Sequence, residues 1–137
     1  MIRYIQIQNN SDLPDIKNLN PFRAVVVIDE AISDEWQIKT SKWLVNSGCL
    51  YMMAWGNDCS SWDDSVDYAN LEEWNYEEIP EQSSVMTTWH EKDSIEEVYW
   101  YAKYSAFHSV VDIKNLVILH ISSTSKEKEF INMYKVV

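Results

Sequence analysis

The sequence predicts one three-layer α/β domain, in which helices cover both faces of a mainly parallel sheet of four to five strands. Four mainly apolar runs are expected to be strands, and the continuous, β-branched run of residues 24–28 is typical of a strand buried on both faces. The stretches between them have the spacing of amphipathic helices, and this alternation favours a parallel sheet. A length of 137 residues suits one domain, and no internal repeat or linker divides the chain.

Residues 1–20 are expected to form an N-terminal segment, and residues 21–137 the single α/β domain. Residues 4–8 alternate between apolar and polar side chains, as an edge strand would, and a loop rich in Asn, Asp and Pro follows. The strands of the main sheet are then expected over about residues 23–29, 49–55, 85–89 and 116–121.

Capping residues mark the helices between these strands. Ser33 is a good N-cap for the first helix, and Gly48 is placed to end that helix in a left-handed conformation. Ser94 and Glu97 have the spacing of a capping box, which opens another helix. Two further helices are expected over residues 61–74 and 126–134.

The charge of the chain is concentrated in one stretch. No lysine or arginine lies between Lys42 and Lys92, whereas ten acidic residues do, in a chain whose formal net charge is −11. Five of the seven tryptophans lie in the same stretch. Such a field repels nucleic acid and attracts cations or basic proteins.

Composition excludes several classes of protein. Gly48 and Gly56 are the only glycines, too few for the glycine-rich loop of a dinucleotide-binding enzyme or a P-loop NTPase. The predicted fold is therefore Rossmann-like or flavodoxin-like but without that loop. No apolar run reaches the roughly 18 residues of a membrane span, and residues 1–6 lack the apolar core of a secretion signal. Two cysteines do not make a secreted disulfide framework, so a cytoplasmic location is expected.

The carboxyl ends of the predicted strands bring one set of reactive side chains toward a common edge. Ligands bind at this edge in open α/β sheets. Cys59, His90 and His120, with Asp29 or Asp58, have the ligand types of a catalytic zinc site. Cys59 at a helix start is equally a candidate nucleophile with His90 as its base. No short metal-binding spacing is present, so no metal or cofactor is assigned. The alternative is an inert cysteine beside two histidines that satisfy neighbouring polar groups.

A second set combines carboxylates with indoles. Asp63, Asp64 and Asp67 have the spacing of one helix face, and the expected binding surface joins them to Asp29, Trp55, Asp58, Trp62 and Trp89. Tryptophans rimmed by carboxylates form a cage for a cationic ligand or the anchors of a protein interface. The alternative is that the indoles complete the core and that the helix dipole accounts for the first-turn acids.

Four segments resemble a family of small bacterial proteins known as a domain of unknown function. They are residues 21–29 (PFRAVVVID), 47–56 (SGCLYMMAWG), 58–67 (DCSSWDDSVD) and 86–91 (MTTWHE). The resemblance spans about residues 21–122. It implies a bacterial soluble protein and adds no activity, cofactor or catalytic residue.

Two functions from different classes follow from the residues. The first is a binding module of the immunity or regulatory type, whose acidic surface holds a basic protein partner and contacts neither nucleic acid nor membrane. The second is a small hydrolase-like enzyme that uses Cys59, His90 and His120. The sequence favours the binding module, because its charge pattern is explicit whereas the catalytic set depends on expected strand ends.

Overall fold

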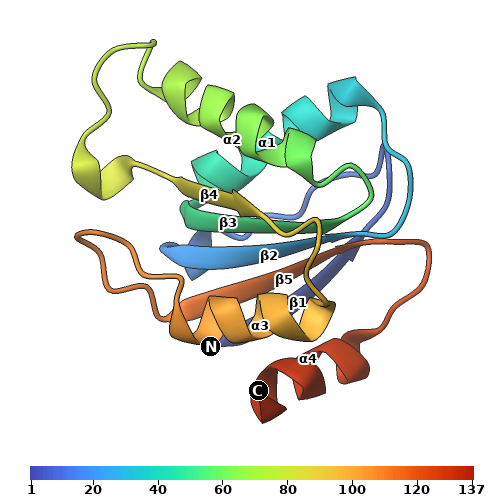
Figure 1. Cartoon of the computed structure of the whole chain (residues 1–137). Helices are drawn as coiled ribbons and strands as arrows, with labels where there is room; N and C mark the ends of the chain where they lie inside the picture. The colour runs from blue at the N-terminus through green and yellow to red at the C-terminus, as the bar shows by residue number, and fades with distance from the viewer.

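A computed structural model describes all 137 residues and contains one sheet of five parallel strands (Figure 1). The order of the strands across the sheet is β1-β5-β2-β3-β4, so the last strand of the chain lies between the first two. The bounds are β1 (Ile2–Ile7), β2 (Phe22–Ile28), β3 (Cys49–Gly56), β4 (Met86–Trp89) and β5 (Asn115–Ile121).

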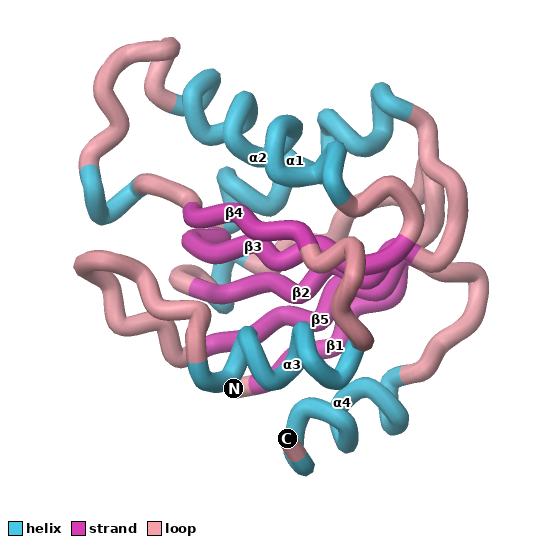
Figure 2. The backbone as a smooth tube through the Cα atoms, in the orientation of Figure 1, coloured by secondary structure: helices cyan, strands magenta, loops and turns pink.

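Helices cover both faces of this sheet, which confirms the predicted three-layer α/β fold. α1 (Asp34–Ser47) and α2 (Ser60–Glu73) lie on one face, and α3 (Ile95–Tyr104) and α4 (Glu127–Val136) lie on the other (Figure 2). Short 3-10 turns occupy Lys17–Leu19 and Glu81–Ser83. None of the helices has the length and apolar character needed to cross a membrane.

Each face of the sheet has its own apolar core, because side chains alternate along a strand. Val26 of β2 packs with Leu44 and Trp62 beneath α1 and α2. The preceding residue, Val25, faces the opposite way and packs with Tyr99 and Phe130 beneath α3 and α4. Both cores include fully buried strand residues, as expected for a parallel sheet that is covered on two sides.

The sequence signals set the limits of the elements. The Ser33 side chain accepts a hydrogen bond from the Trp36 backbone amide, and Gly48 ends α1 with φ of 105°. Ser94 and Glu97 form the predicted capping box at the start of α3. The four strands expected in the main sheet are all present and parallel, with limits close to those predicted.

The N-terminal segment contains the expected edge strand, which belongs to the same sheet as the rest of the chain. β1 pairs with β5 and not with β2, the next strand in sequence. Ile16 and Leu19, in the connection that follows, are buried against the α1 and α2 face. Because β5 lies between β1 and β2, the carboxyl ends of β2 and β5 are neighbours, and the side chains that follow these ends meet.

Candidate functional site

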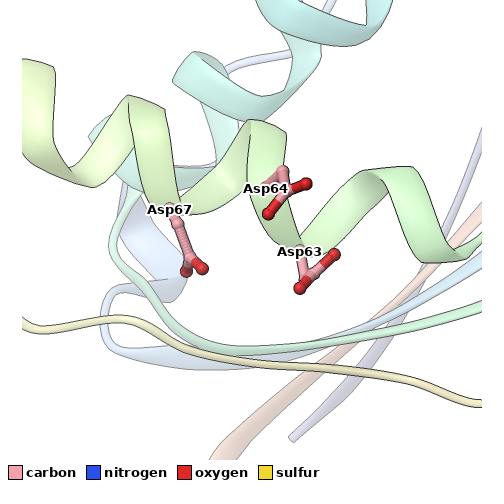
Figure 3. A group of neighbouring side chains, drawn as sticks. All are labelled: Asp63, Asp64 and Asp67. Atoms are coloured by element: carbon pink, nitrogen blue, oxygen red, sulfur yellow. The ribbon is translucent and has the colours of Figure 1, made fainter.

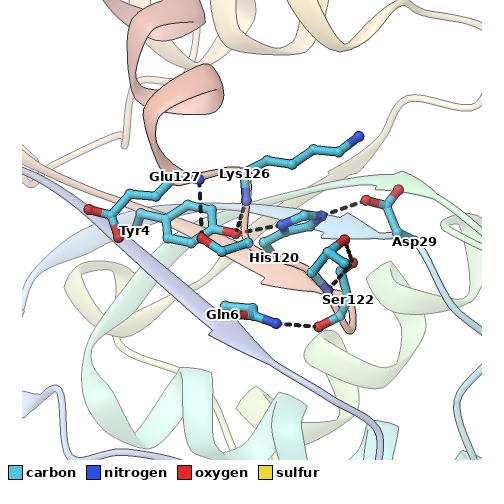
Figure 4. A network of polar contacts seen from close by, with 9 residues as sticks. Tyr4, Gln6, Asp29, His120, Ser122, Lys126 and Glu127 are labelled. Carbon is cyan, nitrogen blue, oxygen red and sulfur yellow. Dashed lines mark hydrogen bonds and ion pairs between the residues drawn. The ribbon is translucent and has the colours of Figure 1, made fainter.

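His120 is the centre of a polar network at the carboxyl edge of the sheet. It is fully buried near the end of β5, where its ring packs against Phe130 of α4. Its Nδ1 atom lies 2.6 Å from the hydroxyl of Tyr4, and its Nε2 atom lies 2.5 Å from a carboxylate oxygen of Asp29 (Figure 4). The hydroxyl of Tyr4 also accepts a hydrogen bond of 3.0 Å from the backbone amide of Lys126.

One placement of protons satisfies this whole network. Nε2 of His120 donates to the Asp29 carboxylate, Tyr4 donates to Nδ1, and the amide of Lys126 donates to Tyr4. Both ring nitrogens are then used within the chain. Because Lys126 precedes the first turn of α4, the network connects β1, β2 and β5 to that helix. The network therefore stabilises the contact between these elements, and neither ring nitrogen of His120 is left free for a ligand.

Tyr99 of α3 packs beside this network with its hydroxyl unpaired. Its side chain is fully buried, and the hydroxyl has no hydrogen-bond partner. Burial raises the pKa of Tyr99 well above its usual value, and the nearby Tyr4 and Asp29 raise it further. The phenol therefore remains protonated over the whole physiological range.

His90 has a separate network at the end of β4. Its Nδ1 atom lies 2.8 Å from Asp93, its Nε2 atom lies 2.9 Å from the hydroxyl of Thr88, and Tyr101 of α3 packs against its ring. The indole of Trp55 donates to the backbone carbonyl of Asp93. This arrangement fixes the turn between β4 and α3. Neither His90 nor His120 lines any of the five best-defined grooves on the molecule.

Cys59 lies on the other face of the sheet from His120. It is buried in the core beneath α1 and α2. Burial raises the pKa of the Cys59 thiol, the Glu91 carboxylate adds to this, and the backbone amide of His90 offsets part of it. A raised pKa is the opposite of what a nucleophilic cysteine needs. The structure does not bring the predicted set of Cys59, His90 and His120 together: Cys59 and His120 lie on opposite faces of the sheet, and none of the three belongs to a group of side chains that could share a metal ion.

The one group of side chains close enough to share a cation consists of Asp63, Asp64 and Asp67. Their carboxylates lie within 4.8 Å of one another on α2, and Figure 3 shows Asp63 and Asp67 directed toward the sheet. Asp67 accepts a hydrogen bond of 3.0 Å from the hydroxyl of Thr87 in β4. Partial burial raises the pKa of Asp67, and repulsion by Asp63 and Asp64 raises it further, while Thr87 lowers it. No lysine or arginine forms an ion pair with the three carboxylates.

The tryptophans expected beside these acids are distributed differently. Trp62 is only 1% exposed and belongs to the core, since its spacing with Val66 places both on the inner side of α2. Trp55 packs against the core on the α3 and α4 face, because it alternates with Ala54 along β3. Trp89 is the exception, 47% exposed at the end of β4. The predicted single aromatic and acidic surface is therefore corrected to an acidic cluster with one exposed indole in the adjoining strand.

Two predicted acids lie apart from this cluster. Asp29 follows β2 and is held by His120 on the α3 and α4 face. Asp58 is exposed in the turn before α2, with a positive φ of 49°, and its backbone carbonyl accepts hydrogen bonds from Ser61. Neither residue joins the carboxylate cluster of Asp63, Asp64 and Asp67.

A groove between α1 and α2 was not expected from the sequence. Its volume is about 450 Å³, and Asp64 and Glu72 line it together with Ile38 and Tyr68. Ile38 is 50% exposed and Tyr68 is 65% exposed. The signal available in the sequence was an apolar residue on each otherwise polar helix face, which is too common to identify a groove.

The fold and this surface define the class of the protein, a small acidic α/β domain with an uncompensated carboxylate cluster on one helix. The chain belongs to the family described as Domain of unknown function (DUF7684), whose model matches residues 2–137. No curated protein and no solved structure matches the chain.

Replacement of Tyr4 by Phe should destabilise the protein by about 1–2 kcal/mol. The change leaves Nδ1 of the buried His120 and the Lys126 amide without their partner. Urea unfolding measures the loss, with Tyr104→Phe as the control, because the hydroxyl of Tyr104 is exposed and contacts only the C-terminal residue. If Tyr4→Phe and the wild type are equally stable, the network does not contribute to the stability of the protein.

Replacement of Asp67 by Asn should raise the free energy of unfolding at pH 7 by roughly 0.2–0.5 kcal/mol, because it removes a charge that is disfavoured by partial burial and by repulsion from Asp63 and Asp64; solvent screening keeps the effect small. Asn keeps an oxygen that accepts from Thr87. Since the pKa of Asp67 is raised in the folded state, the wild type loses stability as pH rises above the ordinary value of 3.8. The gain should vanish near about pH 3. Urea unfolding across this pH range measures the gain, and a difference that does not depend on pH would contradict the destabilisation of the charged Asp67 carboxylate.

The thiol of Cys59 should react with an aromatic disulfide reagent at pH 8 at least about tenfold more slowly in the native protein than in urea, because burial raises its pKa. A Cys49→Ala variant leaves Cys59 as the only thiol, so its rate can be read alone. A fast reaction of the native Cys59 at neutral pH would restore it as a candidate nucleophile.

Proposed function

We propose that the protein is a binding module of the immunity or regulatory type that holds a basic protein partner on its α2 acidic surface. This surface is formed by the carboxylates of α2 and of the segment after it, which are Asp63, Asp64, Asp67, Glu72, Glu73, Glu77, Glu78 and Glu81. All of them are accessible to solvent, although Asp63 is half-buried and Asp67 is partly covered where it contacts Thr87.

The observation that supports this proposal most directly is the lack of compensation within the chain. Lys42 is the only basic residue that pairs with this surface, through an ion pair of 3.1 Å with Glu72. The remaining carboxylates repel one another, and a cationic partner would relieve that repulsion. A surface of one sign also accelerates association with a partner of the opposite sign.

The groove between α1 and α2 gives the surface a place for a side chain of the partner. Lysine and arginine carry an apolar stem and a charged end. The stem fits the exposed faces of Ile38 and Tyr68, and the charged end then meets Asp64, since Glu72 on the same groove is already paired with Lys42. Partly apolar pockets of this kind commonly hold the anchoring residues of an interface.

The enzyme alternative has less support. The hydroxyl, imidazole and carboxylate of Thr88, His90 and Asp93 are hydrogen-bonded in series, as in a hydrolase. However, His90 is buried, and it lines none of the five best-defined grooves, in which a substrate would be expected. Cys59 has no accessible thiol either.

The triple variant Asp63→Asn, Asp64→Asn, Asp67→Asn tests the proposal. A partner is captured from lysate with the tagged chain, purified, and its association rate is measured by surface plasmon resonance at about 50 and 300 mM NaCl. The triple variant should associate at least about tenfold more slowly at low salt, and the difference should shrink at high salt because salt screens the field. The variant should remain folded, since none of the three acids is in the core.

A second triple variant provides the matched control. Asp12→Asn, Glu127→Gln, Glu129→Gln removes the same number of charges at exposed positions away from α2. It should associate nearly as fast as the wild type. Equal slowing by both triple variants would mean that total charge, and not the α2 acidic surface, controls association. No slowing by either would contradict the proposal.

A further inference from the structure

The outer edge of β4 combines features that the acidic surface alone does not explain. β4 is the last strand of the sheet and pairs only with β3 (Figure 1). The amide of His90 donates to Ala54 of β3, and backbone groups of successive residues point to alternate sides of a strand. The backbone N–H and C=O groups of Thr88 therefore also face β3. Those of Thr87 and Trp89 point outward from the free edge of the sheet. No strand or side chain of the protein hydrogen-bonds the N–H groups of Thr87 and Trp89.

The side chain of Asn70 already occupies the start of this edge as a neighbouring strand would. Its Oδ1 atom accepts a hydrogen bond of 2.9 Å from the amide of Val85, and its Nδ2 atom donates one of 3.0 Å to the carbonyl of Ser83. In a parallel sheet an added residue makes the same two bonds: its N–H donates to the carbonyl of one residue, and its C=O accepts from the N–H of the residue two positions further on. Beyond Val85, the corresponding positions at Thr87 and Trp89 remain free.

The edge also lacks the features that usually prevent strands from joining. Proteins protect exposed edges with charged residues, prolines or bulges. Met86–Trp89 contains no charged residue and no proline, and its pairing with β3 is regular. The side chains of Met86 and Trp89 are both close to half exposed. The short length of β4 is the only protective feature that the edge has.

Charge selects the occupant of this edge. Thr87 and Trp89 alternate with Thr88, so their side chains lie on the α2 side, where Thr87 contacts Asp67. In Figure 3, Asp63 and Asp67 point from α2 toward this strand. A segment added to β4 would present every second side chain to these carboxylates. A second copy of the chain would bring two acidic α2 helices together, which is unfavourable for a protein with a formal net charge of −11.

From these observations we infer that β4 binds an extended basic segment of a partner as a sixth strand. Backbone hydrogen bonds to Thr87 and Trp89 hold the segment, and lysine or arginine at alternate positions faces Asp63 and Asp67. This inference rests on the proposed function, because it specifies how a basic partner is held. It adds the requirement that the bound segment has free backbone N–H groups. A purely electrostatic contact has no such requirement.

The probe is a capped eight-residue peptide of alternating lysine and valine with a fluorescent label, and its binding is measured by anisotropy. Two further peptides carry N-methyl groups, one on every lysine and the other on every valine. The charge is identical in all three, but each methylated set blocks hydrogen bonding along one side of the strand. Strand addition requires that one methylated peptide binds at least about tenfold more weakly and that the other binds nearly as the parent does. Equal binding of all three overturns strand addition and leaves the acidic surface proposal in place.

Variants of the protein test the same edge from the other side. Thr87→Pro removes an N–H that faces away from β3, a position at which edge strands tolerate proline, and should weaken the parent peptide at least about tenfold. Thr87→Val keeps the N–H and reports how much of the loss belongs to the contact with Asp67. Gln6→Pro places a proline in the opposite edge strand β1 as the control for fold. The methylated peptides decide the question on wild-type protein if Thr87→Pro does not fold.

The remaining outcomes separate the two proposals. An alternating glutamate and valine peptide that binds as well as the lysine peptide contradicts the role of charge in both. Failure of the lysine peptide to bind overturns strand addition alone, since the salt-dependent association of the captured partner tests the acidic surface independently. A dimer in analytical ultracentrifugation that Thr87→Pro converts to a monomer identifies a second copy as the occupant, and overturns the basic segment.

Discussion

The position of β5 between β1 and β2 is the constraint on which the arrangement of the domain depends. β5 has a hydrogen-bonded strand on each side and a helical layer on each face, so nearly all of its residues are buried. A buried histidine in such a strand must have partners for both ring nitrogens, because unpaired polar groups are costly in an apolar interior. Tyr4 from β1 and Asp29 after β2 are those partners, and they are available only because β5 separates the two strands.

The same constraint divides the molecule into two halves with different roles. On the α3 and α4 face, the titratable side chains at the carboxyl edge are bonded to one another and hold turns and helix ends in place. On the α1 and α2 face, the carboxylates of α2 have little compensation within the chain. The histidines that suggest catalysis by their type are therefore hydrogen-bonded within the chain, whereas most of the carboxylates of α2 have no cationic partner within it.

Most of the fold could be predicted from the sequence, and the candidate site only in part. Buried strands and helix caps are local signals, so the apolar run of β2 and the capping box of Ser94 identified their elements. Strand order is set by packing between distant segments and leaves no local signal. The face on which a side chain lies was also missed for Trp55, since a fully apolar strand gives no alternation that distinguishes Trp55 from Ala54. Trp62 was different, because its spacing with Val66 did indicate a buried helix face.

The acidic cluster and the free edge of β4 are both unfavourable features for an isolated chain. Partial burial of the Asp67 carboxylate and its repulsion by Asp63 and Asp64 destabilise the folded chain slightly, and the raised pKa of Asp67 reflects both. Natural proteins stay only marginally stable, so such a cost persists most readily where it serves interaction with another molecule. An unprotected edge strand alone invites indiscriminate pairing. Carboxylates placed beside that edge repel other acidic chains, including copies of this one, and favour a basic strand. In the proposed complex, charge thereby supplies the selectivity that the backbone groups of Thr87 and Trp89 lack.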